Sequence, residues 1–365
     1  MAEARSSRRG SQSDAARLLL AAARERFAVA ATDLLLPDRA RLTEWQRLTA
    51  AGLLARLVGS IEDALRVRLA ERFAASEALH AALSSAHVPI ALPILERAGV
   101  LRDAELTTIL VRRVEEHRFW KAKAAVRAEE YLFDLVRDSD EAVAAAAMEL
   151  VIARSRRFDR FQEPVMGRVE LPAELQHKLV WMVAAALRQY VVQQHRVGGV
   201  DAAVEAAAAA VIGGYDEGES LEACALRLAR ALHRAGRLDG GALARIIGDG
   251  VLPFFLAGVS VLCGLDPGAA WEVLSDPRGR GPALLLRAAG VARGEAAAIL
   301  LALNARGPLF SGAEGDAAAA QIELFDTVDT ASAREVLRLW QAHPAYRASI
   351  ARISTRARAG AAEAA

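Results

Sequence analysis

The longest helical pattern in the chain runs from Leu171 to Arg196. Apolar residues recur in it at spacings of three and four, which places them on one stripe of a helix with about 3.6 residues per turn: Leu175, Leu179, Met182, Val183, Ala186, Leu187, Tyr190 and Val191. Val180 and Trp181 lie beside this stripe and widen the apolar surface. Pro172 suits a first helical turn, where its missing N–H costs nothing. The pattern predicts a central helix that contacts neighbours on more than one side.

Shorter segments of similar layout precede this stretch. Four apolar residues open them at steps of 25, 29 and 24 residues: Leu65, Ile90, Phe119 and Val143. Such a period is typical of stacked helical hairpins, which cannot bury their apolar faces alone. After Phe158 the pattern loosens through Pro164 and Gly167, where we expect a joint. The spacing predicts a helical-repeat array on the N-terminal side of that joint.

Five regions are expected along the chain. They are a disordered tail (1–13), an N-terminal HEAT-like array (14–166), the central helix with a second array (167–306), closing helices (307–353) and a second disordered tail (354–365). The first tail is polar and basic and lacks the apolar core of a secretory signal. We therefore expect a cytoplasmic protein.

The composition favours an all-α fold. Apolar residues make up 53% of the chain and aromatic residues only 5%, so its core consists largely of Ala, Leu and Val. The alternation of β-branched and aromatic residues that marks strands is absent. Arg188 interrupts the apolar run of the central helix, and the apolar stretch Val251–Leu265 is only 15 residues long and contains Gly258. A membrane span needs about 18 or more apolar residues, so we expect a soluble protein with no such span.

Charge and cysteine content point to no particular ligand. The 46 basic and 45 acidic side chains leave a net charge of +1, so no global field selects nucleic acid or an acidic membrane. Cys224 and Cys263 are the only cysteines, and neither lies in a CxxC motif or near a histidine at ligand spacing. We expect both to be buried thiols of a reducing cytoplasm.

The sequence carries no recognisable catalytic motif. It contains no GxSxG elbow, no SxxK motif and no pair of histidines four residues apart. A metal site could arise only if the fold brought His87 and His117 together, a much weaker hypothesis than structural roles for both. The glycine pairs near 213, 240 and 248 follow no strand, and we interpret them as helix C-caps. We expect no cofactor and no metal, and the sequence favours a non-enzymatic protein.

One cluster of basic and aromatic residues could form an interaction surface. It comprises Arg112, Arg113, Arg118, Trp120, Lys121, Lys123, Arg127, Arg156 and Arg157. Basic groups with exposed aromatics can hold a nucleic-acid backbone and stack a base. However, residues 112–168 contain twelve basic and eleven acidic side chains, so most of the charge is neutralised. Phe119 and Trp120 also fall where a repeat would bury them, and we favour a core role for both.

Several stretches resemble one known family. They are Leu171–Leu175, Leu179–Arg188, Pro93–Arg97, Leu101–Leu106, Leu286–Gly290 and Val336–Trp340. These stretches resemble an uncharacterised family of alphaproteobacterial proteins, defined as a domain of unknown function and described as HEAT-like. The resemblance implies a cytoplasmic bacterial helical-repeat protein with a regulatory role, and it supplies no functional residues. Phe119–Lys121 departs from this pattern, where smaller aliphatic residues are usual.

Together these observations predict an all-α, HEAT-like helical-repeat solenoid with a long central helix and further C-terminal helices. Repeat architectures create extended concave surfaces, so the expected function is a non-enzymatic scaffold for a protein partner in regulation or signalling. The alternative is a nucleic-acid-binding protein or a HEAT-like base-excision enzyme that uses the basic cluster between Arg112 and Arg160. Nucleic acid is the less favoured partner because the cluster is nearly neutral.

Overall fold

Helices form every regular element in the part of the chain that the structure describes. The computed structural model describes residues 42–85, 88–124, 131–276, 279–304 and 317–343, together with 346, 347, 349, 350 and 353. A single isolated β-bridge joins Phe158 to Pro164 within them. The expected all-α class is therefore confirmed for the described residues. Both expected tails and the N-terminal part of the first array lie outside them.

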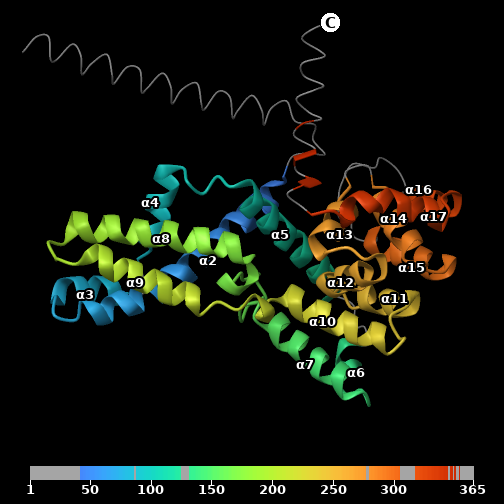
Figure 1. Cartoon of the computed structure of the whole chain (residues 1–365), viewed down its shortest axis with the longest axis horizontal. Coiled ribbons are helices and arrows are strands. Elements are labelled where there is room, and N and C mark those ends of the chain that lie inside the picture. Colours follow the sequence, from blue (N-terminus) through green and yellow to red (C-terminus); the bar gives the residue numbers. More distant parts are fainter. Residues whose placement is uncertain are drawn as a thin grey trace, which may run out of the picture. The chain divides into compact units, whose positions relative to one another are not determined.

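A first group of helices packs around α2. It comprises α2 (Glu44–Arg72), α3 (Glu77–Ser84), α4 (Ala91–Ala98), α5 (Ala104–Ala124), α8 (Ala173–Gln194) and α9 (Val200–Gly213). α2 contacts the other five, and α8 lies against α9 and α4 (Figure 1). Leu57, Ile61 and Leu187 are among its fully buried side chains. The helix predicted around Leu171–Arg196 is thus α8, with Pro172 as its N-cap.

A second group packs around α10 and α12. It comprises α6 (Tyr131–Val136), α7 (Glu141–Ser155), α10 (Leu221–Arg234), α11 (Gly240–Gly248), α12 (Leu252–Cys263), α13 (Pro267–Leu274), α14 (Gly281–Ala288), α15 (Arg293–Asn304), α16 (Ala317–Thr327) and α17 (Thr330–Leu337). α10 contacts α7 and α12, and from α11 to α16 each helix contacts the next (Figure 1). The first nine residues of α12 are all buried, which explains the apolar stretch near Val251.

Helix α5 contributes to both hydrophobic cores. Leu106, Leu110 and Val114 in its first half pack in the core around α2, and Phe119 packs in the core around α10 and α12. Three short 3₁₀ helices, Arg168–Glu170 (η2), Glu217–Glu219 (η3) and Arg338–Gln341 (η4), complete the described elements. Between Leu110 and Phe119, α5 also carries the charged residues of the site described below.

No single described helix is long and apolar enough to cross a membrane. α12 and α13 reach that length and composition only as a pair, and they meet at an angle of 104°.

Five helices end in the same glycine turn. Gly99, Gly236, Gly250, Gly264 and Gly290 follow α4, α10, α11, α12 and α14 with φ between +64° and +76°. In each turn the next residue donates its backbone N–H to the carbonyl five positions earlier, as Arg237 does to Leu232 at 2.9 Å. This is the Schellman motif, whose left-handed residue is favourable only for glycine and, less so, asparagine. The same type of connection therefore follows five of the described helices.

Two expectations about local structure need correction. Gly240–Gly241 begins α11 and does not cap a helix C-terminus, because Asp239 caps the helix by accepting the N–H of Ala242 at 2.8 Å. The proposed repeat register also fails: Leu65 lies deep inside the 29-residue α2, whereas Val143 lies in the first turn of α7. The even sequence spacing therefore does not mark equivalent places in successive hairpins.

Candidate functional site

Six charged side chains, four of them buried and two half-buried, form a network between the two cores. The ion network comprises Arg112, Arg113, Glu116, Arg157, Glu170 and Glu222. Three positive charges face three negative charges, so the network is formally neutral. Its members come from α5, the turn after α7, η2 and the first turn of α10. Segments distant in the sequence are thus joined by charge as well as by apolar contact.

The α5 part of the network follows from helical spacing. Residues three and four positions apart lie on the same face of a helix. Accordingly, Arg112 Nε donates to Glu116 Oε1 at 2.9 Å and Arg113 Nη1 donates to Glu116 Oε2 at 2.7 Å. Arg113 Nη2 also donates to Glu170 Oε2 at 3.0 Å. One carboxylate on α5 thereby fixes two adjacent arginines, and one of these reaches η2.

Arg157 joins the remaining carboxylates. Its guanidinium donates to Glu116 at 2.9 Å, to Glu170 at 2.8 Å and to Glu222 at 2.7 Å. The side chains of Arg157, Glu116 and Glu170 are each 5% exposed. Buried charges of this kind are tolerated only when they are paired and hydrogen-bonded. Arg157 is therefore the central cation of the network.

Burial changes the acidity of the network carboxylates. It raises the pKa of Glu170 to about 7, even though Arg113 favours the ionised form. Burial likewise raises the pKa of Glu116 against the opposing effect of Arg113 and Arg112. For Arg113, burial alone would lower the pKa, but the charges of Glu116, Glu222 and Glu170 outweigh it and raise the pKa. Arg113 thus stays charged, while Glu116 and Glu170 hold protons more tightly than in water.

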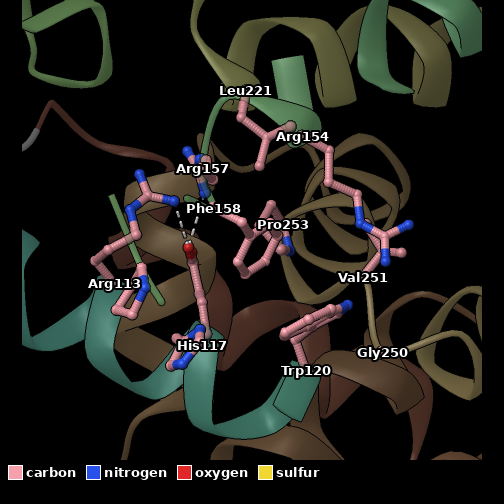
Figure 2. Close-up of a pocket in the computed structure, with 12 residues that line it drawn as sticks. Arg113, His117, Trp120, Arg154, Arg157, Phe158, Leu221, Gly250, Val251 and Pro253 are labelled. Carbon is pink, nitrogen blue, oxygen red and sulfur yellow. Dashed lines mark hydrogen bonds and ion pairs between the residues drawn. The ribbon is translucent and has the colours of Figure 1, made fainter. Parts of the chain in front are cut away.

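A small pocket lies on one side of the ion network (Figure 2). We call it the His117 pocket. It has a volume of about 40 Å³, is open on one side, and is lined by Arg113, Glu116, His117, Trp120, Arg154, Arg157, Phe158, Pro164, Leu221, Gly250, Val251 and Pro253. The Trp120 and Phe158 ring centroids are 4.3 Å apart, and each ring lies 5.9 Å from the imidazole of His117. The pocket thus has an aromatic wall beside a buried imidazole.

His117 has no hydrogen-bond partner within the described residues. The side chain is 3% exposed, and neither Nδ1 nor Nε2 is paired. Burial lowers the pKa of His117, with the charge of Glu163 acting in the opposite direction. The imidazole is therefore neutral at pH 7 and offers one donor and one acceptor. A buried polar group left in this state costs about 1–3 kcal/mol.

A much larger groove borders the ion network at Arg112 and Glu222. This acidic groove has a volume of about 900 Å³, and α5, η3, α10 and α13 supply most of its lining. Five of its lining residues are carboxylates, namely Glu105, Glu217, Glu222, Asp266 and Glu272. Only Arg112 and His343 are basic, and the apolar lining comes from Ile109, Pro172, Leu226, Pro267 and Trp271. The groove combines an excess of negative charge with apolar walls.

The predicted interaction residues occupy three kinds of position. Arg113 and Arg157 are 4% and 5% exposed and lie in the interior, with Arg112 beside them. Arg118 is half-buried and pairs with the buried Glu115 at 2.7 Å. Two others pair with carboxylates at the surface: Lys121 with Glu163 at 3.6 Å and Arg156 with Glu219 at 3.5 Å. The Lys123 side chain and all of Arg127 lie outside the described residues. Of the described members of this cluster, Arg113 and Arg157 thus lie in the interior, and Lys121 and Arg156 lie at the surface.

The two aromatic residues of the cluster differ in their environments. Phe119 is 3% exposed, which confirms the expected core role. Trp120 is half-buried and packs against Phe158 and His117. Trp120 lines the His117 pocket and stays partly accessible there. It is therefore neither a core residue nor an exposed stacking platform.

Neither a thiol nucleophile nor a metal centre is indicated where the structure gives side-chain positions. Cys224 is buried as expected, whereas Cys263 is half-buried. Burial raises the pKa of Cys263 to about 12, and it also raises that of Cys224, so both remain protonated and weakly nucleophilic near pH 7. Among the described residues, no three His, Cys, Asp or Glu side chains are placed to hold a metal ion. His87 lies outside them.

Sequence reasoning missed Glu170, Glu222 and the unpaired state of His117. Glu170 lies 57 residues from Arg113, and Glu222 lies 65 residues from Arg157. The sequence predicts only a local role for Glu222, as an acidic residue in the first turn of a helix. Its link to Arg157 depends on how α10 packs against α7, and no short-range pattern carries that information.

One family model matches the chain. It is described as an uncharacterised protein conserved in bacteria (DUF2336), and the match covers residues 90–338, which are 249 of the 365 residues. The ion network and the His117 pocket lie entirely within this range, as does the acidic groove except for His343. No curated protein and no solved structure matches the chain.

Proposed function

The chain belongs to the bacterial DUF2336 family, and from that premise we propose that it is a non-enzymatic, cytoplasmic scaffold that binds a basic segment of a protein partner. The acidic groove is the proposed binding surface. We further propose that the helices from α10 to α17 act as a HEAT-like repeat array with a regulatory role.

The charge of the groove is the observation that carries the proposal. Glu105 and Glu217 are exposed, and their side chains make no ion pair with any described residue. Glu272 and Asp266 are paired with Arg347, at 2.9 Å and 3.9 Å, and Glu222 belongs to the ion network. Two carboxylates are therefore left for arginine or lysine side chains of a partner. Complementary charge speeds encounter and excludes wrong partners.

Apolar groups in the groove supply the second requirement for peptide binding. Trp271 is buried at the base, and the Arg112 guanidinium lies over its ring at 5.4 Å from the centroid. Ile109 and Leu226 are half-buried on the flanking helices α5 and α10. Because Arg112 is also held by Glu116 in the ion network, this floor is fixed before a partner arrives. A preformed floor lowers the entropic cost of binding.

The repeated glycine turn supports the scaffold part of the proposal. Four of the five turns, at Gly236, Gly250, Gly264 and Gly290, fall within α10–α15. There each helix from α11 onward packs against the next. Stacked helical units joined by one kind of connection are typical of repeat proteins, which commonly serve as binding surfaces.

The nucleic-acid alternative loses support from the placement of the basic residues. Arg112, Arg113 and Arg157 are neutralised inside the ion network, and Arg118 and Arg156 lie beside carboxylates. Strong binding of a phosphate backbone needs several cations that release counterions together. A steep fall in single-stranded DNA affinity with rising salt would nevertheless restore this alternative.

A peptide titration tests the proposal. We would measure binding of a labelled peptide of alternating Arg and Leu by fluorescence anisotropy, with a Glu and Leu peptide as the charge control. Replacing both Glu105→Lys and Glu217→Lys should weaken binding of the basic peptide at least tenfold, because two attractions become repulsions. Glu77→Lys with Glu323→Lys is the matched control, since both of these glutamates are exposed and neither lines the groove. Equal affinity of the groove and control variants would refute the proposal.

A further inference from the structure

The His117 pocket has the properties of a ligand site distinct from the acidic groove. Its imidazole is 3% exposed, both ring nitrogens lack a partner among the described residues, and the ring lines the pocket (Figure 2). By contrast, most buried polar side chains in proteins have at least one hydrogen-bond partner. His117 therefore has hydrogen-bonding capacity that no described protein atom uses.

The size of the pocket limits what can enter it. One water molecule needs about 10–15 Å³ of such volume, so 40 Å³ accommodates about three atoms of that size. This is room for the hydroxyl-bearing end of a ring but not for a whole drug-sized molecule. Because the pocket is open on one side, the remainder of a ligand can extend out of it.

The charge of the pocket disfavours an ionic ligand. Arg113 and Arg157 are neutralised by Glu116 and Glu170, and Arg154, the third basic residue of the lining, has an interaction of its own. A charged ligand would lose its water and would have to compete with these partners for a counter-ion, which is unfavourable. A neutral molecule with one hydrogen-bonding group avoids this cost.

The walls select the rest of the ligand. Trp120 and Phe158 form one wall, and Leu221, Val251 and Pro253 supply apolar surface around it. Aromatic rings pack favourably against each other in offset or edge-to-face arrangements. We propose that the His117 pocket binds a small neutral aromatic molecule bearing a hydroxyl group. The ligand ring packs against Trp120 and Phe158, and the His117 imidazole, whose nitrogens are covered in this structure, turns toward the pocket to bond to the hydroxyl.

Paired probes test this proposal directly. Phenol and benzene have almost the same shape, and only phenol can bond to the imidazole. We would titrate each into the full chain labelled with ¹⁵N-histidine and follow the ring nitrogens by NMR. Phenol should shift the His117 nitrogens saturably, and benzene should bind about tenfold or more weakly because it leaves the imidazole unpaired. His177 is the internal control, since its Nε2 already accepts from Trp181 Nε1 at 3.1 Å.

Two variants separate specific binding from general effects. His117→Phe keeps an aromatic ring but removes both nitrogens, so phenol and benzene should then bind equally. Leu221→Phe adds bulk at the pocket lining and should weaken both probes, with His117 itself intact. Circular dichroism would establish that each variant is folded.

Three results would overturn the proposal: no movement of the His117 nitrogens with phenol, equal affinity for benzene, or unchanged discrimination in His117→Phe. The first would mean that water alone satisfies the imidazole. N-acetyltyrosinamide is the final arm, because a tyrosine side chain carries the same group. Binding at least tenfold tighter than phenol would assign the pocket to a partner's tyrosine and would overturn the small-molecule form of the proposal. The test is independent of the acidic groove, which shares no lining residue with the His117 pocket.

Discussion

Removing the central cation of the ion network should destabilise the protein strongly. Arg157→Met retains most of the side chain's length and apolar stem but deletes every charged hydrogen bond. The three carboxylates would then share only Arg112 and Arg113, which leaves one uncompensated negative charge in a site that is 5% exposed. Breaking a buried ion pair from one side costs about 3–5 kcal/mol. We expect a loss of that size in the free energy of unfolding.

Urea unfolding followed by circular dichroism at pH 8 would measure this loss. At that pH, Glu170 is mostly ionised, since its pKa is about 7. Arg156→Met is the matched control: the neighbouring arginine is 54% exposed, and its partner Glu219 lies 3.5 Å away. Exposed pairs of this kind contribute about 1 kcal/mol or less.

A double variant tests the reasoning from the opposite direction. Arg157→Met combined with Glu170→Gln restores neutrality, with two arginines facing two carboxylates. Its stability should therefore exceed that of Arg157→Met alone, and the two substitutions should be strongly non-additive. The reasoning would be refuted if Arg157→Met stayed within 1 kcal/mol of the wild type, or if the double variant lost the sum of the two single effects.

Three further results are expected. The pKa of Glu170 is raised from 4.5 to about 7, so the folded state binds this proton more tightly than the unfolded state does. The contribution of Glu170 to stability is therefore full below pH 4.5 and is lost as the pH rises to 7. The stability difference between wild type and Glu170→Gln should therefore shrink by up to about 3 kcal/mol over that range, and a constant difference in pH-dependent unfolding would contradict it. Gly281→Ala should lower the free energy of unfolding by about 1–3 kcal/mol or more in a thermal unfolding experiment, because its Cβ would lie 1.6 Å from the Val273 carbonyl oxygen. Gly59→Ala is the control: it has open space around it in α2, and it should stabilise the protein by up to about 1 kcal/mol. Cys263 should resist alkylation at pH 8 in the native protein, since its pKa is about 12, and rapid labelling detected by mass spectrometry would disprove this.

Local elements could be predicted from the sequence because their signals are local. The apolar stripe of Leu175, Leu179 and Leu187 is buried in α8 as its spacing required. Asp266 followed by Pro267 marks the start of α13, where the aspartate accepts the N–H of Ala269 at 2.8 Å. The near-neutral charge of the basic cluster likewise anticipated that its arginines would be paired.

The site itself could not be predicted, because its parts meet only through tertiary packing. The count over residues 112–168 omitted Glu170 and Glu222, and these are the carboxylates that Arg157 binds across the interior. Trp120 was expected to lie in a core. Instead it packs against Phe158, which belongs to another segment, and it lies half-buried in the lining of a pocket. A pattern along one helix shows which face is apolar and does not show what will cover that face.

Reversing the charge of the acidic groove tests the proposed function most directly. The variant with Glu105→Lys and Glu217→Lys would be titrated with both the Arg and Leu peptide and the Glu and Leu peptide, beside the wild type. The wild type should prefer the basic peptide, and the variant should prefer the acidic one, because the apolar walls are unchanged and only the sign of the two free charges differs. An unchanged preference for the basic peptide in the variant would contradict the assignment of the groove as the binding surface.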